Sequence, residues 1–523
     1  MSVSTAASER TPPAEWAAER AELHQRIAAL EHQLEWFKRQ LFGETSERRH
    51  LEPPPEQMSL GEGIGAPALD PAAKRTVDAH QRRISAKRTD DDAKAALFFD
   101  ERVPVETIAV PNPEMANLPA DAYELIGEKV THRLAQRPGS YVVLKYVRPL
   151  IKRRDDQSLH CPPAPPAVFE GGRADVSFLA GLVIEKFLYH LPLYRQHQRL
   201  TAAGIQVSRQ WLTQQVLASA LLLAPIVEAQ LASIRRCRVI AMDETPIKAG
   251  RKGKGKLNTA YFWPIWGERD DGGGEIVFLY RPSRAAIHVR EGLGETLPNG
   301  AVLISDGYSA YARYAERTGL THAQCWAHTR RGFERAKDIE PEAVAEALAR
   351  IGALYAVEQH IREHRLAGEA KQRYRLAHAK PVADAFFDWA EAQARHAALL
   401  PSNPLTKALH YALERREGLS VYLADADVPI DTNHLERALR PIPMGRKNWL
   451  FCWSEVGAEA VATLQSLLVS CRLQDVDPYD YLVDVLQRID THPAKDVEQL
   501  TPRLWKQHFA DHPLRSDLHR TNA

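Results

Sequence analysis

Two short apolar runs, far apart in the chain, each end in a carboxylate. One runs from Cys237 to Met242, where Val239, Ile240 and Met242 are typical of a buried strand, and leads directly into Asp243 and Glu244. Residues 302–304 read Val-Leu-Ile, and Asp306 follows after one serine. A short, continuous apolar run is typical of a strand that is buried on both faces. Acids at strand ends usually mark only the edge of a core, so either acid alone is weak evidence for a site.

The two acids together are stronger evidence. Neighbouring strand ends lie close together in a mixed sheet, so we expect Asp243 and Asp306 to be near each other. Gly307, directly after the second acid, allows the chain to turn sharply there. Two adjacent carboxylates repel each other, and hard divalent cations relieve that repulsion. The pattern therefore predicts that these acids share a pair of cations.

The surrounding pattern predicts an α/β fold for this part of the chain. From residue 236, three strand-like runs precede a helical stretch and then a fourth strand, an order typical of a mixed sheet. The four runs are RVIAMD, NTAYFWPIWG, GEIVFLY and GAVLISDGYSAY. Residues 328–425 are almost wholly helical in pattern, and residues 455–490 indicate two further helices.

Length and composition limit the class of protein. A chain of 523 residues is too long for one core, so we expect several domains. No window holds about 18 uncharged apolar residues, so no membrane span is expected, and the N-terminus lacks the pattern of a signal peptide. The five cysteines are scattered, which is typical of reduced thiols in a cytoplasm. The net charge of +1 is uninformative, but Lys and Arg gather in local clusters that predict basic patches.

The N-terminal segment, residues 1–50, has the pattern of a coiled-coil helix. Its apolar residues alternate spacings of four and three, as an a/d seam does: Leu23, Ile27, Leu30, Leu34, Phe37 and Leu41. A seam of about three heptads is marginal alone, so we expect self-association through residues 23–41. The alternative is an amphipathic helix packed on its own protein. Residues 51–100 are rich in Pro, Lys, Arg and Asp and indicate a linker or a mobile basic arm.

Residues 101–230 predict two small modules. Residues 101–175 show short, basic strands and a proline-rich connector, in which Cys161 has no CxxC companion, so zinc is not expected. Residues 176–230 predict a helix up to Leu200, a Gly-containing turn, and a second helix with Ser208 as its N-cap. In a DNA-reading helix-turn-helix, the second helix would present four side chains to a groove: Arg209, Gln210, Thr213 and Gln214. An ordinary helical hairpin is the commoner structure with this pattern.

A third acid is needed to complete a site for hard metals. Glu436 lies one turn into a helix that Asp431 or Thr432 caps, and basic residues surround it, among them Arg437, Arg440, Arg446 and Lys447. Glu436 either forms salt bridges with these residues or binds metal while they hold a polyanion; spacing alone favours neither. Two Mg²⁺ ions about 4 Å apart activate a water or a 3′-hydroxyl and stabilise the leaving oxygen of a phosphodiester. A phosphate-rich substrate also explains Lys252 and Lys254 in KAGRKGKGK.

Five motifs occur in an order that resembles the large transposases of the insertion-sequence-66 family. They are MDETP, SDGYSAY, CWAHTRRGFE, NHLERALRPIPMGRKNWLF and DPYDYLVDVL, and the N-terminal LEWFKRQLFGETSER and LPLYRQHQRLTAAGIQVSRQWL resemble that family too. The resemblance runs from about residue 20 to the C-terminus.

The resemblance implies a ribonuclease-H-like catalytic domain over residues 236–480, with a helical insertion over about 328–425 and a C-terminal tail over 481–523. It implies a DDE triad of Asp243, Asp306 and Glu436 that uses two Mg²⁺ or Mn²⁺ ions. It extends to Cys325, His328 and Arg331 near the site, for which structural packing is slightly favoured over a direct catalytic part. The family usually carries paired cysteines before the helix-turn-helix. Here only Cys161 remains, which indicates a degenerate zinc-ribbon-like module in residues 101–175.

The function implied is a bacterial transposase that acts in the cytoplasm at the nucleoid. It would bind the inverted ends of its element, cut their 3′ ends and join them to target double-stranded DNA, as an oligomer and with or without accessory proteins of the same element. The alternatives are a transposase-derived DNA-binding protein without cleavage activity and an unrelated metal nuclease. The complete triad argues against the first alternative. The helix-turn-helix and coiled-coil segments argue against the second.

Overall fold

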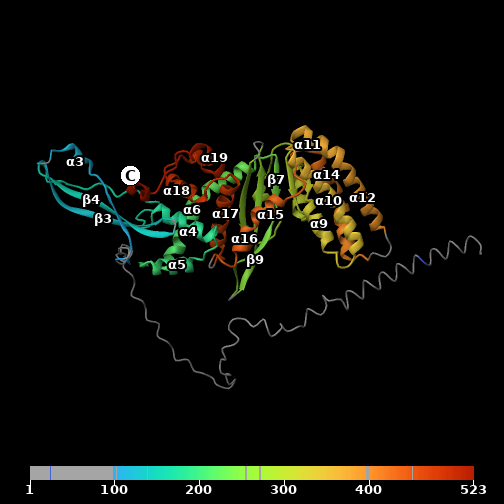
Figure 1. The fold of residues 1–523 in the computed structure, drawn as a ribbon, viewed down its shortest axis with the longest axis horizontal. Coiled ribbons are helices and arrows are strands. Elements are labelled where there is room, and N and C mark those ends of the chain that lie inside the picture. The colour runs from blue at the N-terminus through green and yellow to red at the C-terminus, as the bar shows by residue number, and fades with distance from the viewer. Residues whose placement is uncertain are drawn as a thin grey trace, which may run out of the picture. The chain divides into compact units, whose positions relative to one another are not determined.

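The computed structural model describes most of the chain after residue 97, in two compact units. The described residues are 24, 98–99, 101, 103–119, 121–137, 139–253, 256–269, 273–395, 400–449 and 452–522. One unit comprises Ala95–Ala327 and Glu417–Ala523; the described part of the other comprises His328–Arg416, the helices α9 to α13 in Figure 1. The predicted coiled-coil seam and most of the predicted linker lie outside the described residues.

The larger unit is built on a six-stranded mixed sheet. Its strand order is β10-β9-β7-β11-β12, and β8 pairs with β9 beside this path. The strands β8, β9 and β10 run antiparallel to their partners, whereas β7, β11 and β12 are mutually parallel. Their bounds are β7 (Val239–Met242), β8 (Thr245–Gly253), β9 (Lys256–Glu268), β10 (Gly274–Arg281), β11 (Val302–Ser305) and β12 (Thr321–Gln324).

The sequence predicts four of these six strands and misses β8 and β12. The four residues of β7 and the four of β11 are all buried, as their continuous apolar runs predict. The missed strands are polar: β8 reads TPIKAGRKG and β12 reads THAQ. Pairing with β9 and β11 recruits them, so neighbouring strands rather than their own side chains determine their conformation.

Helices cover both the edge and the face of this sheet. Edge strand β10 has backbone groups with no strand beside them, and α17 (Glu455–Leu473) supplies the partners: Ser466 Oγ accepts from Phe278 N at 2.9 Å. From α6 (Arg209–Ile234), Gln230 Nε2 donates to Ile276 O at 2.6 Å. Buried polar side chains thus satisfy an otherwise open sheet edge and prevent further strand addition. Two helices follow in the α/β part, α7 (Ile287–Leu293) and α8 (Ser309–Thr318).

The predicted helix-turn-helix region contains three helices rather than two. The expected helix up to Leu200 is wrong, because it is broken into α4 (Val176–Phe187) and α5 (Leu193–Ala202). His190, at φ 56°, and Pro192, which N-caps α5, separate them. A two-residue strand β6 (Ile205–Gln206) pairs with β1 (Phe98–Phe99) before α6 begins.

Helix α6 is long and apolar enough to pass a length-and-composition test for a membrane span, which the search for uncharged windows did not predict. It packs against α17, α4, α5, β9 and β10, so its apolar character follows from protein neighbours on several sides. One such helix is weak evidence for a membrane protein.

Ser208 caps α6 as predicted, since its Oγ accepts from Trp211 N at 3.1 Å. Replacing Ser208 with Ala removes the acceptor, and we expect the first turn of α6 to lose about 1 kcal/mol of local stability. Amide hydrogen exchange in residues 209–213 should accelerate ~5-fold. Ser208→Asp keeps an acceptor and is the matched control. Equal exchange in Ser208→Ala and wild type would contradict the capping role.

The segment before α4 is a separate small sheet. It has the order β2-β4-β3, and β5 pairs with β4. Its bounds are β2 (Val105–Ala109), β3 (Tyr123–Arg137), β4 (Ser140–Arg153) and β5 (Leu159–His160), with α3 (Pro113–Asn117) between β2 and β3. The strands β3 and β4 are longer than the short strands that the sequence predicts. They form one hairpin whose turn includes Gly139 at φ 83°, a conformation that favours glycine.

The C-terminal segment returns to this small sheet. Tyr146 on β4 donates to Asp517 Oδ2 at 2.9 Å, and Leu518 packs on the buried face of β3 and β4. The elements of the segment are α18 (Pro478–Arg488), η3 (Ala494–Leu500), α19 (Pro502–His508) and η4 (Asp517–Asn522). The two helices predicted in residues 455–490 are confirmed as α17 and α18.

The second unit is helical, as the pattern of residues 328–425 predicts. Its helices are α9 (Trp326–Glu334), α10 (Pro341–Glu363), α11 (Gly368–Tyr374), the π-helical turn η2 (Arg375–Ala379), α12 (Lys380–Ala394) and α13 (Pro404–Leu413); α14 (Arg416–Ala424) follows. Arg375 is fully buried in the π-helical turn and forms a bidentate pair with Glu358 of α10, at 2.8 and 2.9 Å. This pair fixes the turn against α10.

Candidate active site

Asp243 and Asp306 follow directly the ends of two neighbouring parallel strands. The register pairs Val302 with Val239 and Ile304 with Ala241, an offset of 63 residues, and the same offset sets Asp306 opposite Asp243. The carboxylates of Asp243, Glu244 and Asp306 each place an oxygen within 4.8 Å of the others. The two apolar strands therefore bring the two acids together, as the sequence predicts.

Ionisation of the Asp243 carboxyl is unfavourable in this cluster. Its Oδ1 accepts from Glu244 N at 2.8 Å, which favours the ionised form. Burial works against ionisation and is the largest effect, and the charges of Glu244, Asp306 and Glu436 add to it. Together they raise the pKa of Asp243 to about 7. A carboxyl in this position is relieved by a proton or by a cation.

Glu244 belongs to the cluster, although the sequence marks it only as the neighbour of Asp243. Its carboxylate accepts from Tyr311 Oη at 2.5 Å and from Arg284 Nε at 2.6 Å. Burial raises the pKa of Glu244, while these two hydrogen bonds oppose the rise. The guanidinium of Arg284 also comes within 4.0 Å of Asp306 and stacks 4.2 Å from the ring of Tyr308. Among the described residues, Glu244 is therefore neutralised by protein partners, whereas no basic group lowers the pKa of Asp243.

Glu436 lies on α15 (Asn433–Leu439), and its carboxylate comes within 4.8 Å of that of Asp243. The start of α15 is held in place by Cys325. Its buried Sγ accepts from Thr432 N at 3.3 Å and from Thr432 Oγ1 at 3.2 Å. Thr432 is the N-cap of α15, but its hydroxyl donates to the thiol and does not accept a hydrogen bond from the first turn of the helix. Cys325 thus has a structural contact that fixes the helix carrying Glu436.

The donor set suits a hard divalent cation. Asp243, Asp306 and Glu436 supply only carboxylate oxygens, the ligands that Mg²⁺ and Mn²⁺ prefer. Asp243, whose pKa is raised by burial and by three neighbouring acids, gains most from a cation. The described thiols do not join a group of possible metal ligands. These carboxylates therefore fit a hard divalent cation.

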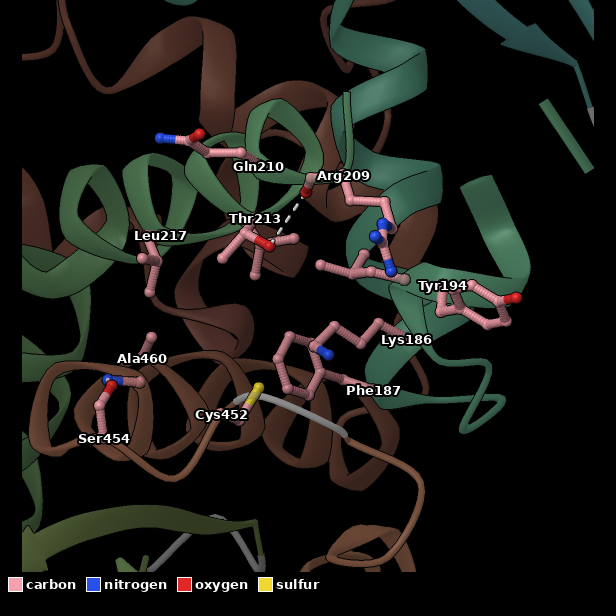
Figure 2. A pocket seen from close by; sticks show the side chains of 13 residues that line it. Lys186, Phe187, Tyr194, Arg209, Gln210, Thr213, Leu217, Cys452, Ser454 and Ala460 are labelled. Atoms are coloured by element: carbon pink, nitrogen blue, oxygen red, sulfur yellow. Dashed lines mark hydrogen bonds between the residues drawn. The ribbon is translucent and has the colours of Figure 1, made fainter. Parts of the chain in front are cut away.

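The predicted DNA-contacting residues of α6 do not all face solvent. Arg209, Gln210 and Gln214 are exposed, but Thr213 is half-buried, and its Oγ1 donates to Arg209 O at 3.2 Å. Thr213 lines a pocket together with Arg209 and Gln210 (Figure 2). The first turn of α6 therefore borders a cavity of the protein itself as well as the exposed surface.

The basic residues near Glu436 form a second pocket. This cavity of about 360 Å³ is lined by Arg440, by Arg437 from α15 and by Arg472 from α17. Within the part of the chain that the structure describes, none of these three guanidiniums pairs with a carboxylate. Arg472 was missed because it lies 32 residues beyond Arg440 (472 − 440) on another helix.

The remaining predicted basic residues and the near-site residues are placed as follows. Arg446 and Lys447 are exposed after α16 (Pro441–Gly445). Lys252 belongs to β8, and Lys254 lies outside the described residues. His328 and Arg331 lie on α9, in the helical unit.

Comparison with known proteins identifies relatives along nearly the whole chain. Residues 171–460 match the family model described as Transposase IS66 family, residues 466–503 the IS66 C-terminal element, and residues 29–108 the Transposase C of IS166 homeodomain. Three similar proteins come from Sinorhizobium fredii, and each is described as uncharacterized. The protein y4hP is 29% identical, covering 92% of this chain and 89% of the relative; y4qI is 30% identical with the same coverage; y4jD is 28% identical, covering 93% and 96%.

Proposed function

The chain belongs to the Transposase IS66 family, and from that premise we propose that it is a DDE-type DNA transposase. It binds the terminal inverted repeats of an insertion sequence and performs metal-dependent strand cleavage and strand transfer. Asp243, Asp306 and Glu436 are its catalytic acids. The observation that carries the proposal is the convergence of these acids from two neighbouring strand ends and one helix, where burial and three neighbouring acids raise the pKa of Asp243.

The sheet supports a ribonuclease-H-like arrangement of the catalytic domain. Three antiparallel strands lead through β7 to two parallel ones, β11 and β12, and the acids follow the two central strands. The helical unit enters the chain between β12 and α15, and therefore between the second acid and the third. This order matches the catalytic domain with a helical insertion that the family resemblance implies.

The three acids would hold two Mg²⁺ or Mn²⁺ ions, which in such a site activate a water or 3′-hydroxyl and stabilise the leaving oxygen. The chain itself supplies orientation. Asp243 is fixed by Glu244 N, Asp306 by Tyr308 N at 2.9 Å, and Glu436 through the contact of Thr432 with Cys325. Arg284 neutralises Glu244 and approaches Asp306, which keeps a cationic group beside the site where phosphate charge develops.

Basic surfaces beside the acids would hold the DNA backbone. Arg437, Arg440 and Arg472 converge on one pocket and pair with no carboxylate of the described residues, and guanidiniums bind phosphate bidentately. Arg209, Gln210 and Gln214, at the start of α6, would contact the repeat itself. We further propose that the N-terminal segment brings copies of the chain together, since two element ends must meet. The protein would act on DNA at the nucleoid.

The deciding experiment is cleavage of a labelled duplex that carries the repeat flanking the gene. We expect the full-length protein to nick the 3′ end of the repeat and join it to a second duplex with Mg²⁺ or Mn²⁺, and to do neither in EDTA. A scrambled repeat is the control. Binding of the repeat without any cutting in either metal would favour a transposase-derived DNA-binding protein instead. Cutting of both duplexes alike would favour a general metal nuclease.

A further inference from the structure

A pocket of about 480 Å³ lies apart from the acid cluster, between α4, the start of α6 and the start of α17 (Figure 2). Its size falls within the range of small-molecule sites. Its wall is largely apolar, with Phe187 from α4 and Val216 and Leu217 from α6. The cleavage chemistry uses none of these residues.

Lys186 gives this pocket a buried cation. The side chain is only 1% exposed, and within the described residues its ammonium has no nitrogen or oxygen acceptor, so its polar neighbour is the thiol of Cys452. The ring of Phe187 lies 5.5 Å away. The thiol beside the ammonium is that of Cys452, which is also buried. Burial raises the pKa of that thiol, and Lys186 only partly opposes the rise. A buried ammonium without a counter-charge is costly, so an anion in the pocket would be strongly favoured.

A second cation stands at the rim. Arg209 lines the same pocket, and its guanidinium lies 5.7 Å from the ring of Tyr194. Figure 2 shows Lys186, Phe187, Arg209 and Cys452 extending into the same space from three separate segments. The pocket thus combines an apolar wall, an aromatic ring and two positive groups. That combination complements a ligand with a flat ring at one end and an anion at the other.

We propose that this pocket binds a single nucleotide, with the base against Phe187, Val216 and Leu217 and the phosphate directed to Lys186 and Arg209. The base is the flat ring and the phosphate is the anion. The pocket adjoins the exposed start of α6, so the nucleotide is an unstacked one of the bound DNA. This choice of source rests on the proposed function, whereas the chemistry of the pocket does not.

Alkylation of Cys452 by iodoacetamide tests the proposal directly. The full-length protein is labelled in EDTA, so no strand is cut, and each cysteine is followed by mass spectrometry. We expect deoxythymidine monophosphate and a short oligothymidine to slow labelling of Cys452 ~10-fold at ten times the dissociation constant. Thymidine and inorganic phosphate, tested at the same concentrations, should protect much less. The four other cysteines do not line the pocket and are internal controls.

Two variants test the two halves of the site. Lys186→Met removes the cation at similar length and should abolish protection, while Lys495→Met makes the same change at an exposed lysine and should not. Leu217→Trp fills the pocket but keeps Lys186, so it should also abolish protection if Lys186→Met fails to fold. Protection that persists in the folded Leu217→Trp protein would overturn the proposal.

The ligands separate the remaining outcomes. Protection by the oligonucleotide at lower concentration than by the mononucleotide supports a nucleotide of DNA, and the reverse supports a free nucleotide. Equal protection by inorganic phosphate or by a poly-glutamate peptide overturns the assignment to a nucleotide, as does no protection at all. If the protein cuts the repeat but shows no protection of Cys452, only the nucleotide pocket is refuted. If it shows protection but never cuts, the proposed cleavage is refuted and the pocket is not.

Discussion

Asp306→Asn is expected to lower the rate of strand cleavage at least ~10³-fold, which corresponds to about 4 kcal/mol of transition-state stabilisation. The amide keeps the size of the carboxylate and can still accept from Tyr308 N, the bond now made at 2.9 Å. The fold and the affinity for the repeat should therefore remain. What is lost is a negative oxygen that faces Asp243 across two parallel strands. Single-turnover cleavage of the labelled repeat, run beside a binding assay, measures both quantities. Glu436→Gln should behave in the same way.

Glu244→Gln is the matched control, because Glu244 belongs to the same cluster of oxygens but is already paired. Its carboxylate accepts from Tyr311 and Arg284. An amide keeps one acceptor oxygen, so we expect less than ~10-fold loss of cleavage rate. Equal losses in Glu244→Gln and Asp306→Asn would mean that the cluster acts as one unit and that the assignment of three separate acids is wrong. Wild-type rates in Asp306→Asn would remove Asp306 from the site.

The strands that end in acids could be predicted because burial determines them locally. Four continuous apolar residues form β7, three apolar residues and a serine form β11, and the acid follows where the chain leaves the core. The strands β8 and β12 could not be predicted in this way. Their residues are polar or basic, and they are strands because β9 and β11 offer backbone partners. Tertiary pairing overrides local preference at such edges.

The hydrogen-bond partners of each acid also could not be predicted from the local sequence pattern. Glu244 is paired with Arg284, 40 residues later, and with Tyr311, 67 residues later. Nothing in MDETP indicates that the second acid is neutralised and the first is not. The break between α4 and α5 was missed for a similar reason, because the apolar pattern continues across His190 and Pro192. Nothing in the helix predicted up to Leu200 singles out Lys186, and only the packing of α17 and α6 around it encloses its ammonium.

The metal-free protein is expected to lose stability as the pH rises from about 4 to about 7, and Asp243→Asn is expected to lose less. The pKa of Asp243 is raised in the folded state to about 7, mainly by burial, from its ordinary value of 3.8. Between these values the folded chain holds a proton that the unfolded chain has released, so each step upward in pH favours unfolding. The contribution is present below pH 4 and is lost by pH 7, and it amounts to ~2–4 kcal/mol.

The difference between wild type and Asp243→Asn, measured by denaturant unfolding in EDTA at several pH values, isolates this group. Acids whose pKa is lowered by a partner, such as Asp425 beside Arg238, give the opposite slope, but they are common to both proteins and cancel. A divalent cation replaces the proton on Asp243, so added Mn²⁺ should stabilise the wild type more at pH 7.5 than at pH 5.5. In Asp243→Asn that pH-dependent gain should largely disappear. If the free energy of unfolding changed with pH in the same way in both proteins, Asp243 would be ionised in the folded state at no cost in stability. Its raised pKa could then not support its assignment as a metal ligand.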